Sequence, residues 1–285
     1  MKDFLKKLGF IAAFAFGFLP GTRVEAAAGL LSSYTADVTF SDPLGGTSMT
    51  IAFDGTYYWT SSGGGTSGVR LAQISSNGAL VQTFSPGLDF RSVFVNPNSR
   101  GTVYARTYAN GTIYQQGSPG VFTVTAVVLP GLDNQTSVVF NGAGSEFLEL
   151  NNGVVSRFNL SGALLGTVNL AGWGANNEST YPQNRGIAAS GDYWFTYVDR
   201  TLSVWNTSGT RLGTTTLVGA GTGFDPNFSL SVANGRVFIT DGSGGLWRGY
   251  KIGDFSAIPE PSTWALLGGG SIACAMLRWR RRRRA

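Results

Sequence analysis

Carboxylates are the side chains that could carry chemistry in this 285-residue chain, because it contains no histidine and its single cysteine, Cys274, lies in an apolar segment. Histidine is the commonest general base and metal ligand, so its absence removes serine–histidine catalysis and the usual zinc sites together. Most aspartates lie near turns, where their oxygens usually bind the local backbone. These aspartates are Asp54, Asp89, Asp133, Asp192, Asp199, Asp225 and Asp241. The sequence therefore predicts neither a catalytic residue nor a metal ligand.

One pair of glutamates stands close enough in sequence to be considered for acid–base work. Glu146 and Glu149 are three positions apart in a predicted strand. Successive side chains of a strand alternate between its two faces, so these two carboxylates should point to opposite sides. That arrangement does not favour a paired acid–base site, in which both carboxyl groups flank one bond.

The elements that would position such residues form a repeat. Between the two ends of the chain, short apolar segments recur every 43 to 49 residues, and each is followed by a turn and an aromatic-rich segment. Alternating apolar and polar residues, rich in β-branched and aromatic types, indicate strands. The predicted first strands are residues 49–53, 92–95, 137–140, 186–189 and 230–233, and the second strands are 56–60, 102–106, 145–150, 192–197 and 236–240.

Later strands of each unit follow glycine turns. Predicted third strands are residues 71–75, 155–159, 201–205 and 246–252, and fourth strands are 80–84, 164–170 and 212–217. In the second unit, residues 120–129 must supply both late strands or one long one. The fifth unit lacks a fourth strand, and residues 34–40 form a strand without a unit.

This pattern predicts an all-β fold, a β-propeller of five four-stranded blades over residues 28–255. The N-terminal strand, residues 34–40, should close the ring by pairing beside residues 246–252. A β-sandwich or β-solenoid with coincidental spacing is the alternative.

The residues that line the channel and rims of such a ring would distinguish three functions. A channel lined by glycine, alanine, valine and serine would favour a non-enzymatic scaffold. Three or more carboxylate or amide oxygens converging on the channel would favour a Ca²⁺-dependent hydrolase or lactonase. An aromatic shelf on one rim would favour a sugar-binding protein; Trp173 and Tyr181 lie in an Asn-rich loop and could stack on sugars, although packing between blades is the favoured interpretation.

Charge does not indicate a nucleic-acid partner. The formal net charge is +5, but 10 of the 21 basic residues lie in the first 27 and last 27 residues. The body between them keeps 11 basic and 13 acidic residues, which leaves a net charge of −2. A folded body of that charge lacks the basic surface that binds phosphate backbones.

The N-terminus has the pattern of a secretory signal peptide over residues 1–27. Lys2, Lys6 and Lys7 precede an apolar run, residues 8–19, which predicts the signal helix. Small residues then provide cleavage positions for signal peptidase, either Val24 and Ala26 or Ala26 and Ala28. An uncleaved membrane anchor is the alternative.

The C-terminus, residues 258–285, has three parts in order. The triplet Pro259-Glu260-Pro261 comes first, and an apolar stretch, residues 262–277, follows it. As a helix this stretch would be about 24 Å long, somewhat short of a bilayer core of about 30 Å. A basic cluster then predicts that the extreme C-terminus stays in the cytoplasm, with the body outside. Its residues are Arg278, Arg280, Arg281, Arg282, Arg283 and Arg284.

These last 28 residues resemble the PEP-CTERM sorting domain, which is also labelled an ice-binding-protein C-terminal domain. The resemblance implies that an exosortase, a membrane transpeptidase, recognises Pro259, Glu260 and Pro261. It implies removal of the transmembrane helix and delivery of the body to the cell surface or exopolysaccharide matrix of a biofilm-forming bacterium. We thus expect an exported protein, anchored transiently in the membrane, whose body binds or builds without catalysis and needs no cofactor.

Overall fold

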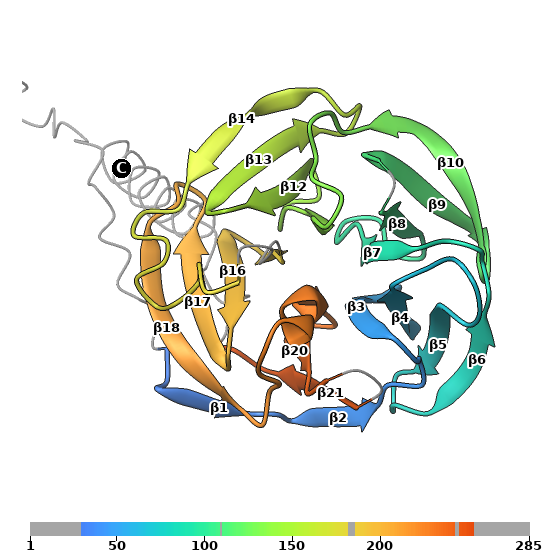
Figure 1. The fold of residues 1–285 in the computed structure, drawn as a ribbon, viewed down its shortest axis with the longest axis horizontal. Coiled ribbons are helices and arrows are strands. Elements are labelled where there is room, and N and C mark those ends of the chain that lie inside the picture. The colour runs from blue at the N-terminus through green and yellow to red at the C-terminus, as the bar shows by residue number, and fades with distance from the viewer. Residues whose placement is uncertain (1–29, 109, 182–185, 243–244, 254–285) are drawn as a thin grey trace, which may run out of the picture.

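Five antiparallel sheets stand around a central axis in the computed structural model, which describes residues 30–108, 110–181, 186–242 and 245–253 (Figure 1). The first blade is β3–β6, the second β7–β10, the third β11–β14 and the fourth β15–β18. The fifth is β19–β21 completed by β2. The five-bladed propeller predicted from the repeat is therefore confirmed.

The inner strands of the blades are buried along most of their length, because the repeat places apolar and aromatic residues where neighbouring blades meet. In each blade the first strand lies innermost and the last lies on the rim (Figure 1). Their bounds are β1 Ser33–Thr35, β2 Val38–Ser41, β3 Thr47–Phe53, β4 Tyr57–Gly63, β5 Leu71–Ser75, β6 Leu80–Phe84, β7 Phe90–Val95, β8 Val103–Thr107, β9 Thr112–Ser118, β10 Val121–Val128, β11 Val138–Phe140, β12 Glu146–Asn151, β13 Val154–Asn159, β14 Leu164–Asn169, β15 Ala188–Ser190, β16 Tyr193–Val198, β17 Thr201–Asn206, β18 Arg211–Val218, η1 Asp225–Ser229, β19 Ser231–Ala233, β20 Arg236–Thr240 and β21 Leu246–Tyr250.

The core is divided into clusters that lie between blades. Phe40 and Trp247 of the fifth blade pack with Ile51 and Tyr58 of the first. Comparable clusters join the first blade to the second, the second to the third, the third to the fourth and the fourth to the fifth. Each interface buries apolar surface that one blade alone would expose, so the blades stabilise one another.

The N-terminal segment closes the ring, but it does so as two strands instead of the single strand predicted. Residues of β2 pair antiparallel with β21, from Val38 opposite Gly249 to Ser41 opposite Leu246, as expected. β1 instead pairs parallel with β18 and adds a fifth strand to the fourth blade. The segment crosses between blades at Asp37, whose carboxylate accepts hydrogen bonds from Arg236 at 2.8–3.1 Å.

The second blade also differs from prediction in its later strands. Residues 120–129 form one long strand, β10, which was one of the two expected arrangements. The third strand is β9, which no pattern predicted, because Gln115, Gln116 and Gly117 interrupt its apolar alternation.

The predicted signal helix at residues 1–27 and the transmembrane helix within residues 258–285 lie outside the described residues. Within the described ranges, no helix has the length and apolar character needed to cross a bilayer.

Closure of the ring by β2 gives a direct prediction for stability. Phe40 is 6% exposed and its ring lies 5.4 Å from that of Tyr58 and 6.0 Å from that of Phe238. Phe40→Ala should lower the free energy of unfolding by about 3–5 kcal/mol, because it leaves a cavity where the ring closes. Urea unfolding followed by tryptophan fluorescence measures the change. Leu80→Ala, on an exposed rim position, is the control and should change stability little; equal losses in both variants would contradict the role of the closing strand.

Candidate functional site

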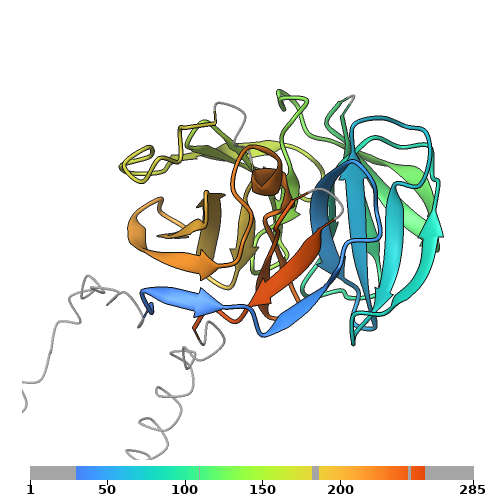
Figure 2. The same cartoon turned by 60° about the horizontal axis from the view of Figure 1, so that its bottom comes forward.

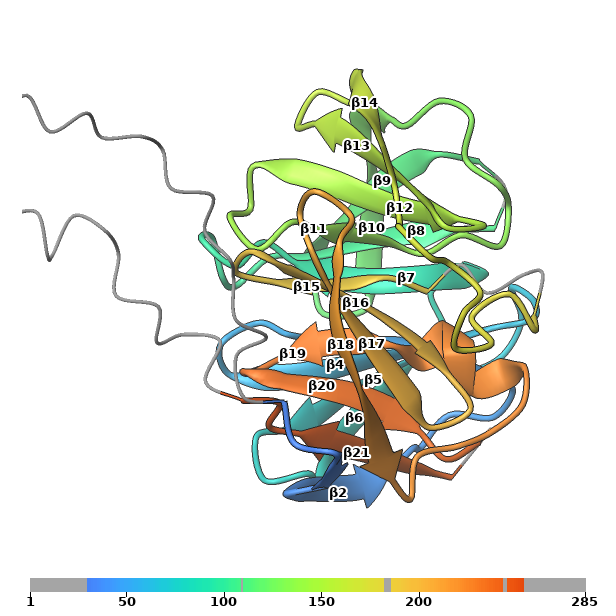
Figure 3. The ribbon, with the colours of Figure 1, turned by 90° about the vertical axis from the view of Figure 1, so that its left-hand side faces the viewer.

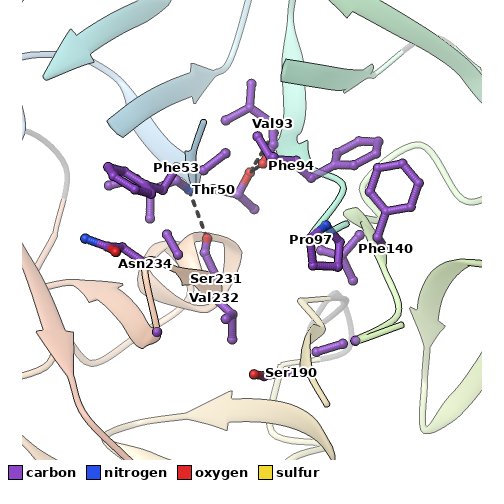
Figure 4. Close-up of a pocket in the computed structure, with 18 of the residues that line it drawn as sticks. Thr50, Phe53, Val93, Phe94, Pro97, Phe140, Ser190, Ser231, Val232 and Asn234 are labelled. Carbon is purple, nitrogen blue, oxygen red and sulfur yellow. Dashed lines mark hydrogen bonds between the residues drawn. The ribbon is translucent and has the colours of Figure 1, made fainter. Parts of the chain in front are cut away.

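The central channel is the site to which all five blades contribute. A cavity of about 220 Å³ is lined by the inner strands β3, β7, β11, β15 and β19 and by the turns that follow them (Figure 4). Small and apolar residues make up most of the lining, including Ala52, Val93, Val139, Ala189 and Val232. Larger apolar residues, Phe53, Phe94 and Phe140, also line the cavity.

The hydroxyl groups of the channel wall are used to join blades. Thr50 Oγ1 accepts a hydrogen bond from the backbone N–H of Val93 at 2.6 Å and donates to the Val93 carbonyl at 2.8 Å. Ser231 Oγ accepts from the N–H of Ile51 at 2.9 Å, and both contacts are drawn in Figure 4. Ser92 Oγ accepts from the N–H of Val138 at 3.0 Å in the next pair of blades. These hydrogen bonds provide partners for backbone groups at the edges of the inner strands, which would otherwise be unpaired.

The mouth of the channel carries its polar side chains. Among the described residues that line the cavity, Arg100 alone bears a charge. Asn234 reaches across an interface between blades, where its Nδ2 donates to Tyr58 Oη at 2.9 Å. Asn141 lines the mouth but caps its own turn by accepting from the N–H of Ser145 at 2.8 Å. Sequence reasoning missed Arg100, since an arginine within an Asn-Pro-Asn-Ser-Arg-Gly turn carries no pattern of its own.

The opposite end of the channel is covered by η1. This short 3₁₀ helix lies on one face of the ring near its centre (Figures 1 and 2), with Pro226, Asn227, Phe228 and Ser229 buried. Ser229 Oγ accepts from the N–H of Thr240 at 2.9 Å, which fixes the helix to the fifth blade. We refer to this side as the η1 face and to the other as the mouth face.

The aspartates singled out in the sequence do not meet at the channel. Asp54 accepts from the N–H groups of Thr56 and Tyr57 and from Trp59 Nε1, at 2.7–2.8 Å. Asp89 accepts from the N–H of Gly64 and forms an ion pair with Arg91 at 2.7 Å. Asp133 and Asp241 also accept backbone N–H groups of their own turns. Across the described residues, no group of three acidic or thiol side chains is arranged to hold a metal ion.

Glu146 and Glu149 lie on different faces of β12. Glu146 accepts two hydrogen bonds from Arg157, at 2.6 and 2.8 Å, at a partly exposed position. Glu149 is buried and accepts from Thr136 Oγ1 at 3.3 Å. Burial raises the pKa of Glu149, and hydrogen bonds from Ser156 and Thr136 oppose the rise. The nearby Arg106 donates to three backbone carbonyls, and burial lowers its pKa to about 10.

Asp42 is the other buried carboxylate with a displaced pKa. It is 6% exposed and accepts hydrogen bonds from Ser48 Oγ and from the N–H of Leu44, the latter at 3.1 Å. Burial raises its pKa above the usual value, and the two hydrogen bonds oppose that rise. Its place is the connection between β2 and β3, away from the cavity lining. A shift of this kind marks a structural carboxylate under the closing strand.

The pKa of Asp42 predicts a pH dependence. Because the folded pKa lies above the unfolded one, the folded state binds the proton more tightly, and ionisation at higher pH costs stability. The contribution of Asp42 should therefore grow as pH falls through its raised folded pKa toward about 3.9, the unfolded value. Asp42→Asn should remove this component from a plot of unfolding free energy against pH, measured in urea. Asp54→Asn, at a half-buried turn outside the closing strand, is the control. Parallel curves for wild type and Asp42→Asn would contradict the assignment.

The residues named in the sequence as sugar-stacking candidates have different positions. Trp173 packs on Trp205, with ring centroids 6.4 Å apart, so it belongs to the interface between the third and fourth blades. Tyr181 lies on the η1 face, where its hydroxyl donates to the carboxylate of Asp199 at 3.1 Å. Phe224, which the sequence did not single out, lies beside it. The sorting residues Pro259, Glu260 and Pro261 and the arginine cluster lie outside the described residues.

The fold and the C-terminal residues together define the class: a five-bladed β-propeller body followed by a sorting signal. Residues 257–283 match the PEP-CTERM protein-sorting motif, which is processed by exosortases at the cell envelope. A search of curated protein sequences finds no match to the chain.

Solved structures with a similar fold are distant in sequence. PorZ, described as a surface component of the type-IX secretion system of Porphyromonas gingivalis, is 12% identical with a TM-score of 0.37; the match covers 70% of this chain and 24% of PorZ. A protein of unknown function from Bacteroides thetaiotaomicron is 13% identical with a TM-score of 0.44, covering 71% of this chain and 58% of that one. A gluconolactonase from Xanthomonas campestris is 14% identical with a TM-score of 0.42, covering 70% of each chain. This chain thus spans well under two thirds of the length of the first two.

Proposed function

We propose that this chain is an exported protein of the cell surface or extracellular matrix. Its propeller has a binding or structural role and does not catalyse a reaction. The observation that carries the proposal is the sorting motif at residues 257–283, because it directs an exported chain to an exosortase. Signal peptidase and exosortase are the processing partners, and the membrane is a transient one, through the apolar stretch at residues 262–277. Exopolysaccharide is the proposed neighbour of the processed body.

The described channel supports a binding or structural role for the body. Its walls are mostly small and apolar, and the hydroxyl groups of Thr50 and Ser231 form bonds between blades. The turn aspartates hold backbone N–H groups, and the glutamates of β12 point to different sides. A catalytic site would instead bring titratable groups together around one cavity.

The sorting proposal can be tested on the motif. Replacing Pro259, Glu260 and Pro261 by alanine should leave the tail attached, because the exosortase would no longer recognise its substrate. Intact-mass measurement and cell fractionation in an exosortase-bearing bacterium should show a heavier protein retained in the membrane fraction. Wild type should lose the tail and appear at the surface.

Replacing Phe255 and Ser256, just before the matched residues 257–283, provides the matched control and should leave processing unchanged. The body of every variant should melt at the wild-type temperature, because the described core ends at Ile252, which is 2% exposed. A wild-type chain that stays in the cytosol with both ends attached would overturn the proposal.

A further inference from the structure

We propose that the η1 face carries a saccharide-binding shelf formed by Tyr181 and Phe224, and that this shelf takes a neutral hexose ring. The inference deepens the proposed function, and it rests on the body being held at the cell surface. The two residues come from different connections: Tyr181 from the segment between β14 and β15, and Phe224 from the segment between β18 and η1.

The first argument concerns which face of the propeller is available. The end of β21 pairs with the start of β20, Tyr250 opposite Val237, and β20 begins just after Asn234 and Gly235 at the channel mouth. The chain therefore leaves the propeller on the mouth face. Only five residues lie between Gly253 and Pro259, so these two residues are at most about 20 Å apart. In Figure 3, η1 lies on the right-hand side of the ring and the end of the described chain lies on the left. An anchored tail would thus hold the mouth face toward the membrane and direct the η1 face outward.

The second argument concerns the exposed rings on that outward face. Phe224 is 39% exposed, and its ring lies 6.3 Å from that of Tyr181 at an interplanar angle of 62°. Behind it, the buried Phe228 presents its ring at 4.8 Å and 88°, so Phe224 is supported from below. An exposed aromatic ring that is fixed by its neighbours loses little side-chain entropy when it binds.

One carboxylate fixes both members of the shelf. Asp199 accepts from Tyr181 Oη at 3.1 Å and from the N–H of Gly223, the residue before Phe224, at 2.7 Å. Asp199 and Arg200 form a tight turn in which both have positive φ, 42° and 70°. Such backbone angles are costly for residues other than glycine and persist where the surroundings hold them. The turn therefore holds its carboxylate in place under the shelf.

The chemistry of the shelf selects the ligand class. The face of an aromatic ring is its negative side, so it attracts the partly positive C–H groups on the apolar face of a sugar. Two carboxylates, Asp199 and the exposed Asp225, stand beside the rings and would repel an acidic sugar. The guanidinium of Arg200, which donates its Nε–H to the carbonyl of Ala220 at 3.0 Å, offsets one of these two negative charges and leaves the other. A neutral hexose therefore fits better than a uronic acid.

The test measures binding of the full chain, solubilised in detergent, to four hexasaccharides. Three probes are neutral, namely cellohexaose, maltohexaose and mannohexaose, and one is acidic, hexagalacturonate. Microscale thermophoresis should show at least one neutral probe binding more tightly than the acidic one. Phe224→Ala should weaken that binding about tenfold, which corresponds to about 1.4 kcal/mol, and Phe224→Trp should restore it.

Tyr108→Ala is the matched control, because Tyr108 is 40% exposed on the same face but stacks against Arg91 of the second blade, with the guanidinium 4.6 Å from the ring centre. It should leave binding unchanged. Failure of all neutral probes to bind, preference for the acidic probe, or equal loss in both alanine variants would overturn the shelf. Tail cleavage and surface delivery of Phe224→Ala, followed in parallel, should match wild type, so a failed shelf is distinguishable from failed sorting.

Discussion

The whole ring depends on one pair of strands, β2 against β21, because this is where the two ends of the body meet. The pairing joins residues about 200 positions apart, so its loop-closure entropy must be offset by contacts made only on closure. The cluster around Phe40, Tyr58, Phe238 and Trp247 supplies them. β1 extends the closure by pairing with the fourth blade, so the N-terminal segment bridges two blades and ties them together.

Closure of the ring also explains how the hydroxyl groups of the inner strands are used. Five inner strands converge there, and each presents an edge whose backbone groups need partners. Thr50, Ser92 and Ser231 provide them by hydrogen bonds to the next blade, which leaves these hydroxyls committed to structure. The walls between them are small and apolar because five strands crowd one axis. At the rims, by contrast, loop length and composition are free to vary.

Sequence patterns predicted the propeller architecture because period-two alternation and glycine turns are local signals. They predicted five blades, and residues 236–240, 71–75 and 80–84 coincide with β20, β5 and β6. They did not predict β1, since a parallel pairing with β18 depends on where the fourth blade lies in space. Of the two residues of the proposed shelf, the sequence singled out Tyr181 alone. Phe224 is placed beside it because Asp199, 25 residues earlier, holds its loop. Contacts between connections of different blades leave no periodic signal.

The two faces of the propeller differ in the length of the connections that they carry. In the proposed arrangement, the tail determines which face is turned away from the membrane. On the mouth face, short turns such as Gly191-Asp192 and Asn234-Gly235 join the inner strands to the second strands. The η1 face carries the long connections between blades, including the two that supply the shelf. Long connections are where a rigid scaffold places binding residues. A chain that leaves on the short-turn side, a few residues before its sorting motif, keeps the long connections pointing away from the anchor. The face on which the chain leaves β21 and the length of the connections on the other face thus act together in this proposal. If the chain left on the η1 face, the long connections would be turned toward the membrane.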